Sequence, residues 1–162
     1  MTRPAETDRF LLCRIGSRIG ALALRDVRET LRPLPVEPLA GAPPFVLGVT
    51  ILRGAPTPVV DAGRLLDPSV PVDAPFSPPA AARFVSVKLG ERTAALAVDA
   101  VLDVRSLSTD TLRDIPPLLR EAGADRLSQV GALDAELLLV LEAARLVPDS
   151  VWSALDSPEA SA

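Results

Sequence analysis

Three carboxylates, Asp61, Asp99 and Asp103, are the side chains of this sequence best placed to do chemistry together. Neighbouring carboxylates can divide general acid and base roles or hold a metal ion. Asp99 and Asp103 lie on or beside strands of opposite local phase, however, so their spacing aims them at no common point. We expect each carboxylate to accept hydrogen bonds from nearby backbone amides at a turn or strand end. An enzyme built on these carboxylates remains an alternative, which metal analysis of the purified protein would test.

The amino-acid inventory closes many other routes to catalysis. The sequence contains no histidine, no tyrosine and a single cysteine, Cys13. Ser-His-Asp and Cys-His catalysis, histidine metal sites and phosphohistidine chemistry are therefore excluded. Cys13 lies in an apolar segment, which indicates a small buried residue and not a reactive thiol. Because the sequence also lacks a phosphate-binding glycine loop and a cysteine pair, we expect no enzyme activity, no metal and no cofactor.

The charge pattern and the hydropathy limit the choice of partners. The net charge is −4, the isoelectric point is about 4.9, and Lys88 and the arginines form no basic run. A nucleic-acid partner is therefore not expected, since it requires a concentrated basic surface. Residues 1–9 lack an apolar signal core, and no stretch approaches the roughly 18 apolar residues of a membrane span. We expect a cytoplasmic protein without direct membrane insertion.

Short apolar runs separated by turn formers predict an all-β fold with short helices. Runs of this length and spacing are typical of small barrels or a sandwich. Pro56 and Pro58 favour an edge or interrupted strand in their segment. The expected strands are Phe10–Ile15, Ile19–Leu24, Phe45–Leu52, Phe84–Leu89, Thr93–Val98, Ala100–Val104, Gln129–Leu133 and Glu136–Leu141.

Helical turns are expected at a few places between and after these strands. Asp26 is a candidate cap for one or two turns over Asp26–Leu31. Pro148 is expected as the first residue of a closing helix that contains Trp152. Short helical segments are also expected at Gly63–Leu66 and Leu118–Ala122.

The length of 162 residues is that of one domain, and proline marks its internal division. Five prolines in the segment 67–82 predict an exposed loop. We expect a single domain over 9–156, with subdomains at roughly 16–66 and 83–147 on either side of this loop. Disordered tails are expected at residues 1–8 and 157–162.

Arg53 stands apart from the other charged residues. It follows eight mostly apolar residues and precedes Gly54, so it lies where a strand is expected to end. Gly54 permits an unusual turn or the close approach of another chain. The planar guanidinium suits a protein interface, although a solvated strand-end arginine explains the same pattern.

Several segments together resemble the CheW family of chemotaxis coupling proteins. Residues 48–54 (GVTILRG) and 58–61 (PVVD) are similar to the family patterns G-V-x-N-L-R-G and P-V/I-V/I-D-L. Residues 98–104 (VDAVLDV) are similar to V-D-x-V-x-E-V, and residues 27–29 (VRE) match the start of V-x-E-I. The resemblance extends from about Phe10 to Leu146, although Ile51 replaces the usual asparagine.

The resemblance implies a fold of two small five-stranded barrels and a non-catalytic adaptor. Such proteins couple the cytoplasmic tip of a chemoreceptor to a CheA-type histidine kinase, in arrays associated with the membrane. Arg53 carries over as a receptor-facing residue with Glu29 as its charged neighbour, and Val27 and Leu31 become candidate walls of the receptor groove. The resemblance leaves the kinase-binding surface of this chain unassigned.

One further alternative stays open from the residues alone. The chain would then be a small-molecule-binding regulatory β-barrel domain that holds its ligand in a cleft between the two halves. A ligand that binds the folded state raises the melting temperature by mass action. A thermal-shift screen with a metabolite panel therefore discriminates this alternative from an adaptor.

Overall fold

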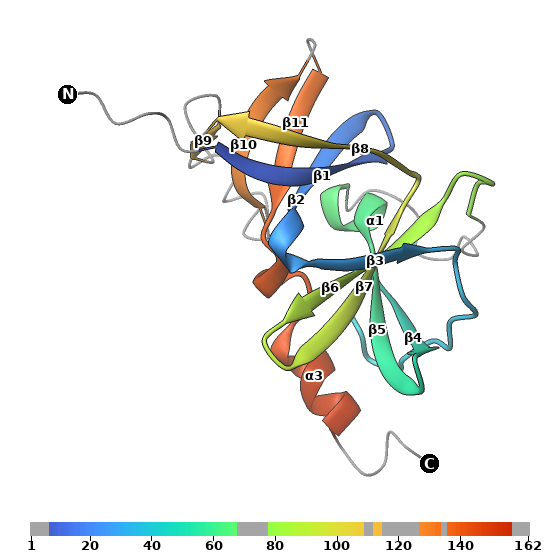
Figure 1. Cartoon of the computed structure of the whole chain (residues 1–162). Coiled ribbons are helices and arrows are strands. Elements are labelled where there is room, and N and C mark those ends of the chain that lie inside the picture. Colours follow the sequence, from blue (N-terminus) through green and yellow to red (C-terminus); the bar gives the residue numbers. More distant parts are fainter. Residues whose placement is uncertain (1–6, 68–77, 109–111, 115–126, 134–135, 157–162) are drawn as a thin grey trace.

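The computed structural model describes residues 7–67, 78–108, 112–114, 127–133 and 136–156. The fold is mainly β, as predicted, and consists of two sheets that lie one above the other in Figure 1. One sheet has the strand order β3-β6-β7-β5-β4, and the other has the order β8-β1-β2-β11-β10-β9. Each sheet is mixed, because β5 runs parallel to β7 and β11 runs parallel to β2.

The two sheets are nested along the chain. The five-stranded sheet uses only the continuous stretch 27–98, while the six-stranded sheet combines strands that precede and follow this stretch. The expected subdomains at 16–66 and 83–147 therefore do not coincide with the sheets. The strands of the five-stranded sheet are β3 (Val27–Leu31), β4 (Val46–Leu52), β5 (Ala55–Asp61), β6 (Arg83–Leu89) and β7 (Arg92–Val98). Those of the six-stranded sheet are β1 (Thr7–Ile15), β2 (Arg18–Ala23), β8 (Ala100–Ser108), β9 (Arg113–Asp114), β10 (Leu127–Leu133) and β11 (Glu136–Leu141).

The predicted helical turns over Asp26–Leu31 are wrong. A short 3-10 helix, η1, occupies Leu24–Asp26 without a side-chain cap, and the chain then enters β3. β3 pairs with β6, which follows it by more than fifty residues in the sequence. Tertiary pairing of this kind overrides a local helical preference.

The proline-containing strand β5 lies inside its sheet, between β7 and β4, so the edge position, one of the two alternatives expected for it, is wrong. Its two-residue hairpin loop makes Leu52–Ala55 a hydrogen-bonded pair, so Pro56 and Pro58 fall in the alternate pairs, which exchange no bonds with β4. Pairing with β7 begins only at Val59. The missing proline amides therefore interrupt neither ladder.

The described residues form three apolar clusters, one inside each sheet and one between the sheets. β1 shows the arrangement, because Phe10 and Leu12 face the interior of the six-stranded sheet while Leu11 and Cys13 face the cluster between the sheets. This alternation follows the two-residue period of a strand. Cys13 is buried, as predicted, and burial raises the pKa of its thiol to about 12. The third cluster surrounds Phe84 inside the five-stranded sheet.

The segment that follows β3 curves back to the outer edge of β4. Glu37 and Val49 exchange two backbone hydrogen bonds of 2.8 Å, which closes this side of the five-stranded sheet. Gly48 makes the approach possible, since a Cβ atom there would lie 1.9 Å from the carbonyl oxygen of Glu37. Gly48 also has a φ of +145°, a conformation that favours glycine.

The closing helix α3 (Asp149–Asp156) follows the six-stranded sheet but packs on the other one. The Pro148 carbonyl accepts bonds from the amides of Val151 and Trp152, so Pro148 precedes the helix and is not its first residue. Arg92, beside the β6–β7 turn, lies 4.9 Å from the Trp152 ring centroid and pairs with Asp156 at 3.3 Å. The helix therefore ties the two sheets together.

The structure tests some of the predictions made for short helices and for the tails. The expected helical turn at Gly63–Leu66 is confirmed as α1 (Ala62–Leu66). The expected helix at Leu118–Ala122 and the tail at 157–162 lie outside the described residues, while β1 already begins at Thr7 within the tail expected at 1–8. In the described part of the chain, no helix has the length and apolar character that a membrane crossing requires.

Replacing Gly48 with alanine tests the closure of the five-stranded sheet. The added methyl group collides with the Glu37 backbone, so we expect Gly48→Ala to lower the free energy of unfolding by about 3 kcal/mol or more. Gly41 has a φ of +79° but open space where a Cβ atom would lie, so Gly41→Ala is the matched control, at about 1–2 kcal/mol. Chemical denaturation of both variants measures the difference, and equal losses would contradict the role of Gly48.

Candidate protein-docking site

Arg53 and Gly54 form the two-residue loop of the β4–β5 hairpin. Leu52 pairs with Ala55, and the φ values of Arg53 and Gly54 are +50° and +79°. Positive φ at both positions defines a type I′ turn, whose first position strongly favours asparagine, aspartate or glycine. Arg53 is the one non-glycine residue with positive φ in the described chain. The arginine therefore occupies a conformation that its own backbone disfavours.

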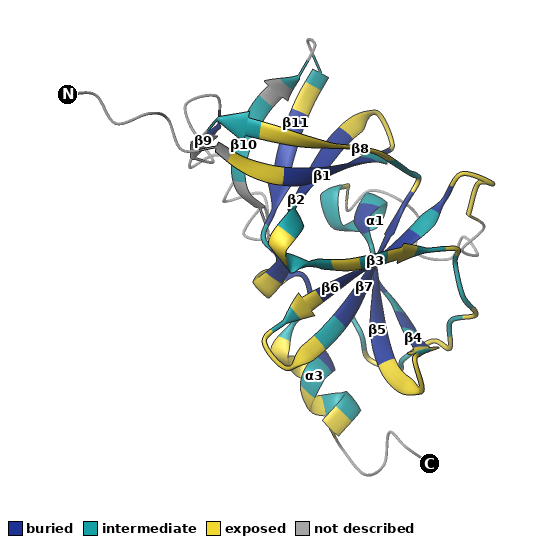
Figure 2. Cartoon of the chain, in the orientation of Figure 1, coloured by how far each residue is buried: buried dark blue, intermediate teal, exposed yellow. Residues whose placement is uncertain are grey.

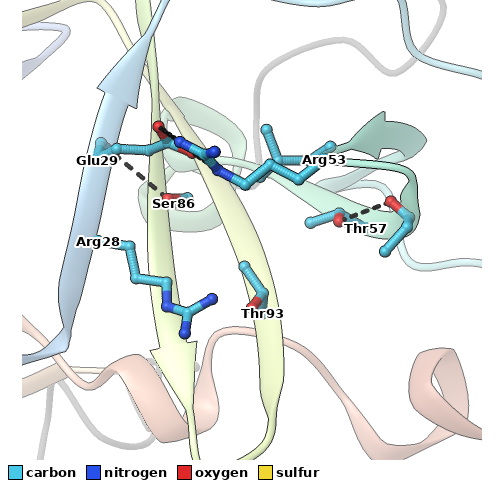
Figure 3. Close-up of a pocket in the computed structure, with 8 residues that line it drawn as sticks. Arg28, Glu29, Arg53, Thr57, Ser86 and Thr93 are labelled. Carbon is cyan, nitrogen blue, oxygen red and sulfur yellow. Dashed lines mark hydrogen bonds and ion pairs between the residues drawn. The ribbon is translucent and has the colours of Figure 1, made fainter.

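The Arg53 guanidinium forms an ion pair with Glu29 on β3. Its Nε donates to Oε1 at 2.9 Å and its Nη2 donates to Oε2 at 2.6 Å, so the contact is bidentate. β3 and β4 are the two outermost strands of the sheet, and the pair therefore spans from one side of the sheet to the other (Figure 3). The Arg53 side chain is 75% exposed even so, while that of Glu29 is 30% exposed.

A hollow with a volume of about 520 Å³ lies beneath this ion pair. Its floor is polar, because hydroxyl side chains from β5, β6 and β7 replace the apolar residues found deeper inside the sheet. Each floor residue lies two positions along its strand from a residue of the inner apolar cluster, and so faces the same way. These pairs are Glu29–Leu31, Thr57–Val59, Ser86–Phe84 and Thr93–Ala95.

Arg28 adds a second cation beside the same hollow. Figure 3 shows its guanidinium extended toward Thr93, on the other side of the hollow from Arg53. Sequence reasoning missed Arg28, Thr57, Ser86 and Thr93. A hydroxyl two positions from an apolar strand residue is a usable signal for Thr57 and Ser86, but only the register shows that the strands bring them together.

The other two predicted site residues, Val27 and Leu31, lie apart from each other. Val27 is half-buried against the cluster between the sheets, and Leu31 is half-buried against the cluster inside the five-stranded sheet. A β-bulge between Val27 and Glu29 shifts the register, so the alternation of faces is interrupted there. The structure therefore brings Glu29 and Arg53 together but does not place Val27 and Leu31 on one wall.

The carboxylates Asp61, Asp99 and Asp103 make the backbone contacts predicted for them. Asp61 caps α1 by accepting the Gly63 amide at 2.9 Å, and burial raises its pKa in spite of this bond. Asp99 accepts the Gly16 amide at 2.7 Å. Asp103 accepts the amide of the next residue at 2.8 Å. Within the described residues, no group of three or more acidic or cysteine side chains is arranged to hold a metal ion.

The space between the two sheets is filled with apolar side chains. The largest apolar cluster occupies the space between the sheets and includes Leu22, Leu96 and Leu146, each at most 1% exposed. This packing leaves no ligand cleft between the sheets, but it does not test a cleft between the halves 16–66 and 83–147, because both halves line the hollow beneath Arg53.

The six-stranded sheet carries an ion pair in a comparable place. Arg14 and Glu136 lie two positions from Leu12 and Leu138, which belong to the cluster inside that sheet. Arg14 Nη1 donates to Glu136 Oε2 at 2.5 Å, and the two side chains are 32% and 42% exposed. Arg14 lies within a regular strand, however, and is less than half as exposed as Arg53. The two arginines therefore differ in backbone conformation and in access to a partner.

Comparison with known proteins identifies the family to which this chain belongs. The family model of the CheW-like domain matches residues 9–151. The chain is 25% identical over 149 residues to the chemotaxis protein CheW of Klebsiella aerogenes, covering 91% of this chain and 86% of that protein. It is 26% identical over 135 residues to the chemotaxis protein CheW of Rhizobium meliloti, covering 83% and 84%.

A solved structure agrees with these sequence matches. The scaffolding protein TtCheW from Thermoanaerobacter tengcongensis superposes with a TM-score of 0.68 at 18% identity, covering 84% of this chain and 89% of that one. The chain belongs to the CheW-like domain family. It is a scaffold of chemotaxis signalling and not an enzyme, as the sequence predicted.

The ionisation of Glu29 reports directly on the candidate site. Hydrogen bonds from Arg53, reinforced by the charges of Arg53 and Arg28, hold the pKa of Glu29 below its usual value. A carboxylate with a lowered pKa contributes stability at neutral pH that is lost as the pH falls through that pKa. We expect Arg53→Ala to raise the Glu29 pKa, as measured by carbon-detected NMR titration.

The equivalent pair provides the control for this titration. Arg14→Ala should raise the pKa of Glu136, which its hydrogen bond to Arg14 lowers, and leave that of Glu29 unchanged. If the Glu29 pKa did not move in Arg53→Ala, the ion pair would not persist in solution.

Proposed function

We propose that this protein couples the cytoplasmic tip of a chemoreceptor to a CheA-type histidine kinase, with Arg53 and Glu29 at the receptor-binding surface. Membership of the family supports a role in chemotaxis signalling, and the names of its relatives agree. The protein acts in the cytoplasm and is recruited to membrane-associated receptor arrays. Its contribution is to hold the two partners in a fixed geometry, so that small changes in the receptor bias the activity of the kinase.

The observation that carries this proposal is the conformation of Arg53. A type I′ turn would be more stable with asparagine at this position. A largely exposed ion pair contributes little to folding, so stability alone is a poor reason to keep an arginine there. Glu29 instead holds the guanidinium in one orientation while leaving most of its surface free. A preorganised side chain loses less conformational entropy when a partner binds.

Val27 and Leu31 complete the proposed receptor surface from the same strand. Both side chains are half-buried, so their remaining surface can meet the apolar stripe of a helical receptor tip without unfolding β3. Their separation by the bulge assigns them to different parts of the contact. Arg28 lies between Val27 and Glu29 and adds positive charge that an acidic group on the receptor would satisfy.

Charge reversal at Arg53 tests the proposal directly. We expect Arg53→Glu to abolish capture by a receptor cytoplasmic fragment, because it places two carboxylates side by side where the guanidinium should present its donors. The melting temperature should stay near that of the wild type, since the side chain is exposed. Pull-down and circular dichroism measure the two effects, and wild-type capture by Arg53→Glu would contradict the proposal.

Two further variants separate the arginine from its ion pair. Arg53→Asn removes the cation but suits the turn, so it should fold at least as well as the wild type and still fail to bind the receptor fragment. Arg14→Glu breaks the comparable pair in the other sheet, and the fragment should still bind it. Loss of capture in both Arg14→Glu and Arg53→Asn would indicate a general effect of instability.

A further inference from the structure

The strand β8 forms one outer edge of the six-stranded sheet. Among the described strands it pairs only with β1, and its residues 102–106 are all exposed. Figure 2 shows this exposure along most of the strand. Two of the exposed residues are large and apolar, since Leu102 is 44% exposed and Val104 is 36% exposed. An exposed strand edge of this kind is a template for pairing with another chain.

The backbone of Val104 points away from β1. Its amide donates to the carboxylate of the preceding residue, Asp103, at 2.8 Å, and so is not used by the β1 ladder. In an antiparallel ladder the amide and carbonyl of one residue point to the same side. The free edge of β8 therefore presents the backbone amide and carbonyl of Val104. Because the direction alternates along a strand, the amide and carbonyl of Ser106 also point away from β1.

The charges on either side of Val104 are complementary under a two-fold rotation. Asp103 precedes Val104 and Arg105 follows it, and the two side chains form a solvent-exposed ion pair of 3.6 Å within the strand. If a second β8 lies antiparallel with Val104 opposite Val104, each Asp103 lies opposite an Arg105 of the second copy. We propose that β8 is a self-association surface, on which two copies of this protein join their six-stranded sheets edge to edge.

The charges also select this register over its neighbours. If the second strand slides by two residues in one direction, Asp103 lies opposite Asp103 of the second copy. A slide by two residues in the other direction places Arg105 opposite Arg105. Like charges directly opposite one another destabilise a strand pair, while opposite charges stabilise it. Only the pairing centred on Val104 satisfies both charges and keeps the side-chain faces matched.

The pairing replaces existing contacts with better ones at each position. The Val104 amide leaves the side chain of Asp103 and donates to the Val104 carbonyl of the second copy, and Asp103 moves to the opposing Arg105. Leu102, which a β-bulge displaces from the β1 ladder, is partly covered together with Val104. Because few residues from each copy take part, the dimer is expected to be weak and reversible.

Sedimentation velocity over a concentration series up to about 1 mM tests the proposal, since this range covers weak interfaces. We expect a monomer–dimer equilibrium in the wild type. Asp103→Arg and Arg105→Asp should each weaken the dimer by about tenfold or more, because each places like charges opposite one another. The double variant Asp103→Arg/Arg105→Asp should restore the dimer.

Two controls make the result specific to this edge. Val104→Pro removes the central amide, which β1 does not use, so this variant should keep its fold by circular dichroism and remain monomeric. Lys88→Asp makes the same change of net charge as Arg105→Asp on a strand of the other sheet and should dimerise like the wild type. A wild type that stays monomeric throughout the series, or dimerisation by Val104→Pro, would overturn the proposal.

Discussion

The apolar cluster between the two sheets is the constraint on which the rest of the structure depends. It takes side chains from both sheets and from the C-terminal helix, so neither sheet can complete its burial alone. β1 depends on this cluster directly, because alternate residues of the strand belong to it and to the cluster inside the six-stranded sheet. A strand buried on both faces tolerates no slip of register, since a one-residue shift would exchange the two sets. The relative position of the sheets is thereby fixed, as a scaffold requires.

Much of the local structure could be predicted from the sequence. The hairpins around Gly16 and Gly90 follow from alternating apolar residues on either side of a turn former, and the backbone contacts of Asp61 and Asp99 follow from their places at strand ends. What local patterns could not supply was the choice of partner strand. The residues of β3 favour a helix locally, and their pairing with β6 makes them a strand. The prolines of β5 favour an edge, and the pairing of that strand with β7 places it inside the sheet.

The same reasoning from local patterns could predict only part of the candidate site. Arg53 stands out by its place before Gly54, but its contact with Glu29 links the β4–β5 loop to β3, which is not a neighbour of β4 or β5 in the sheet. The family resemblance, and not the local pattern, connected the two residues. The floor of the hollow depends on the register of three further strands, and short hydroxyl side chains give little signal in a sequence rich in apolar residues.

The nested order of the sheets has a consequence for how the chain reaches its native state during synthesis. The five-stranded sheet is complete once residue 98 has emerged from the ribosome, whereas β2 must wait for β11, more than a hundred residues later. The first hairpin therefore spends most of translation with one side unpaired. Long-range pairings of this kind form slowly and expose apolar surface in the meantime. The five-stranded sheet is thus complete before the six-stranded sheet, which grows outward from its first hairpin as β8 pairs with β1 and β11 pairs with β2.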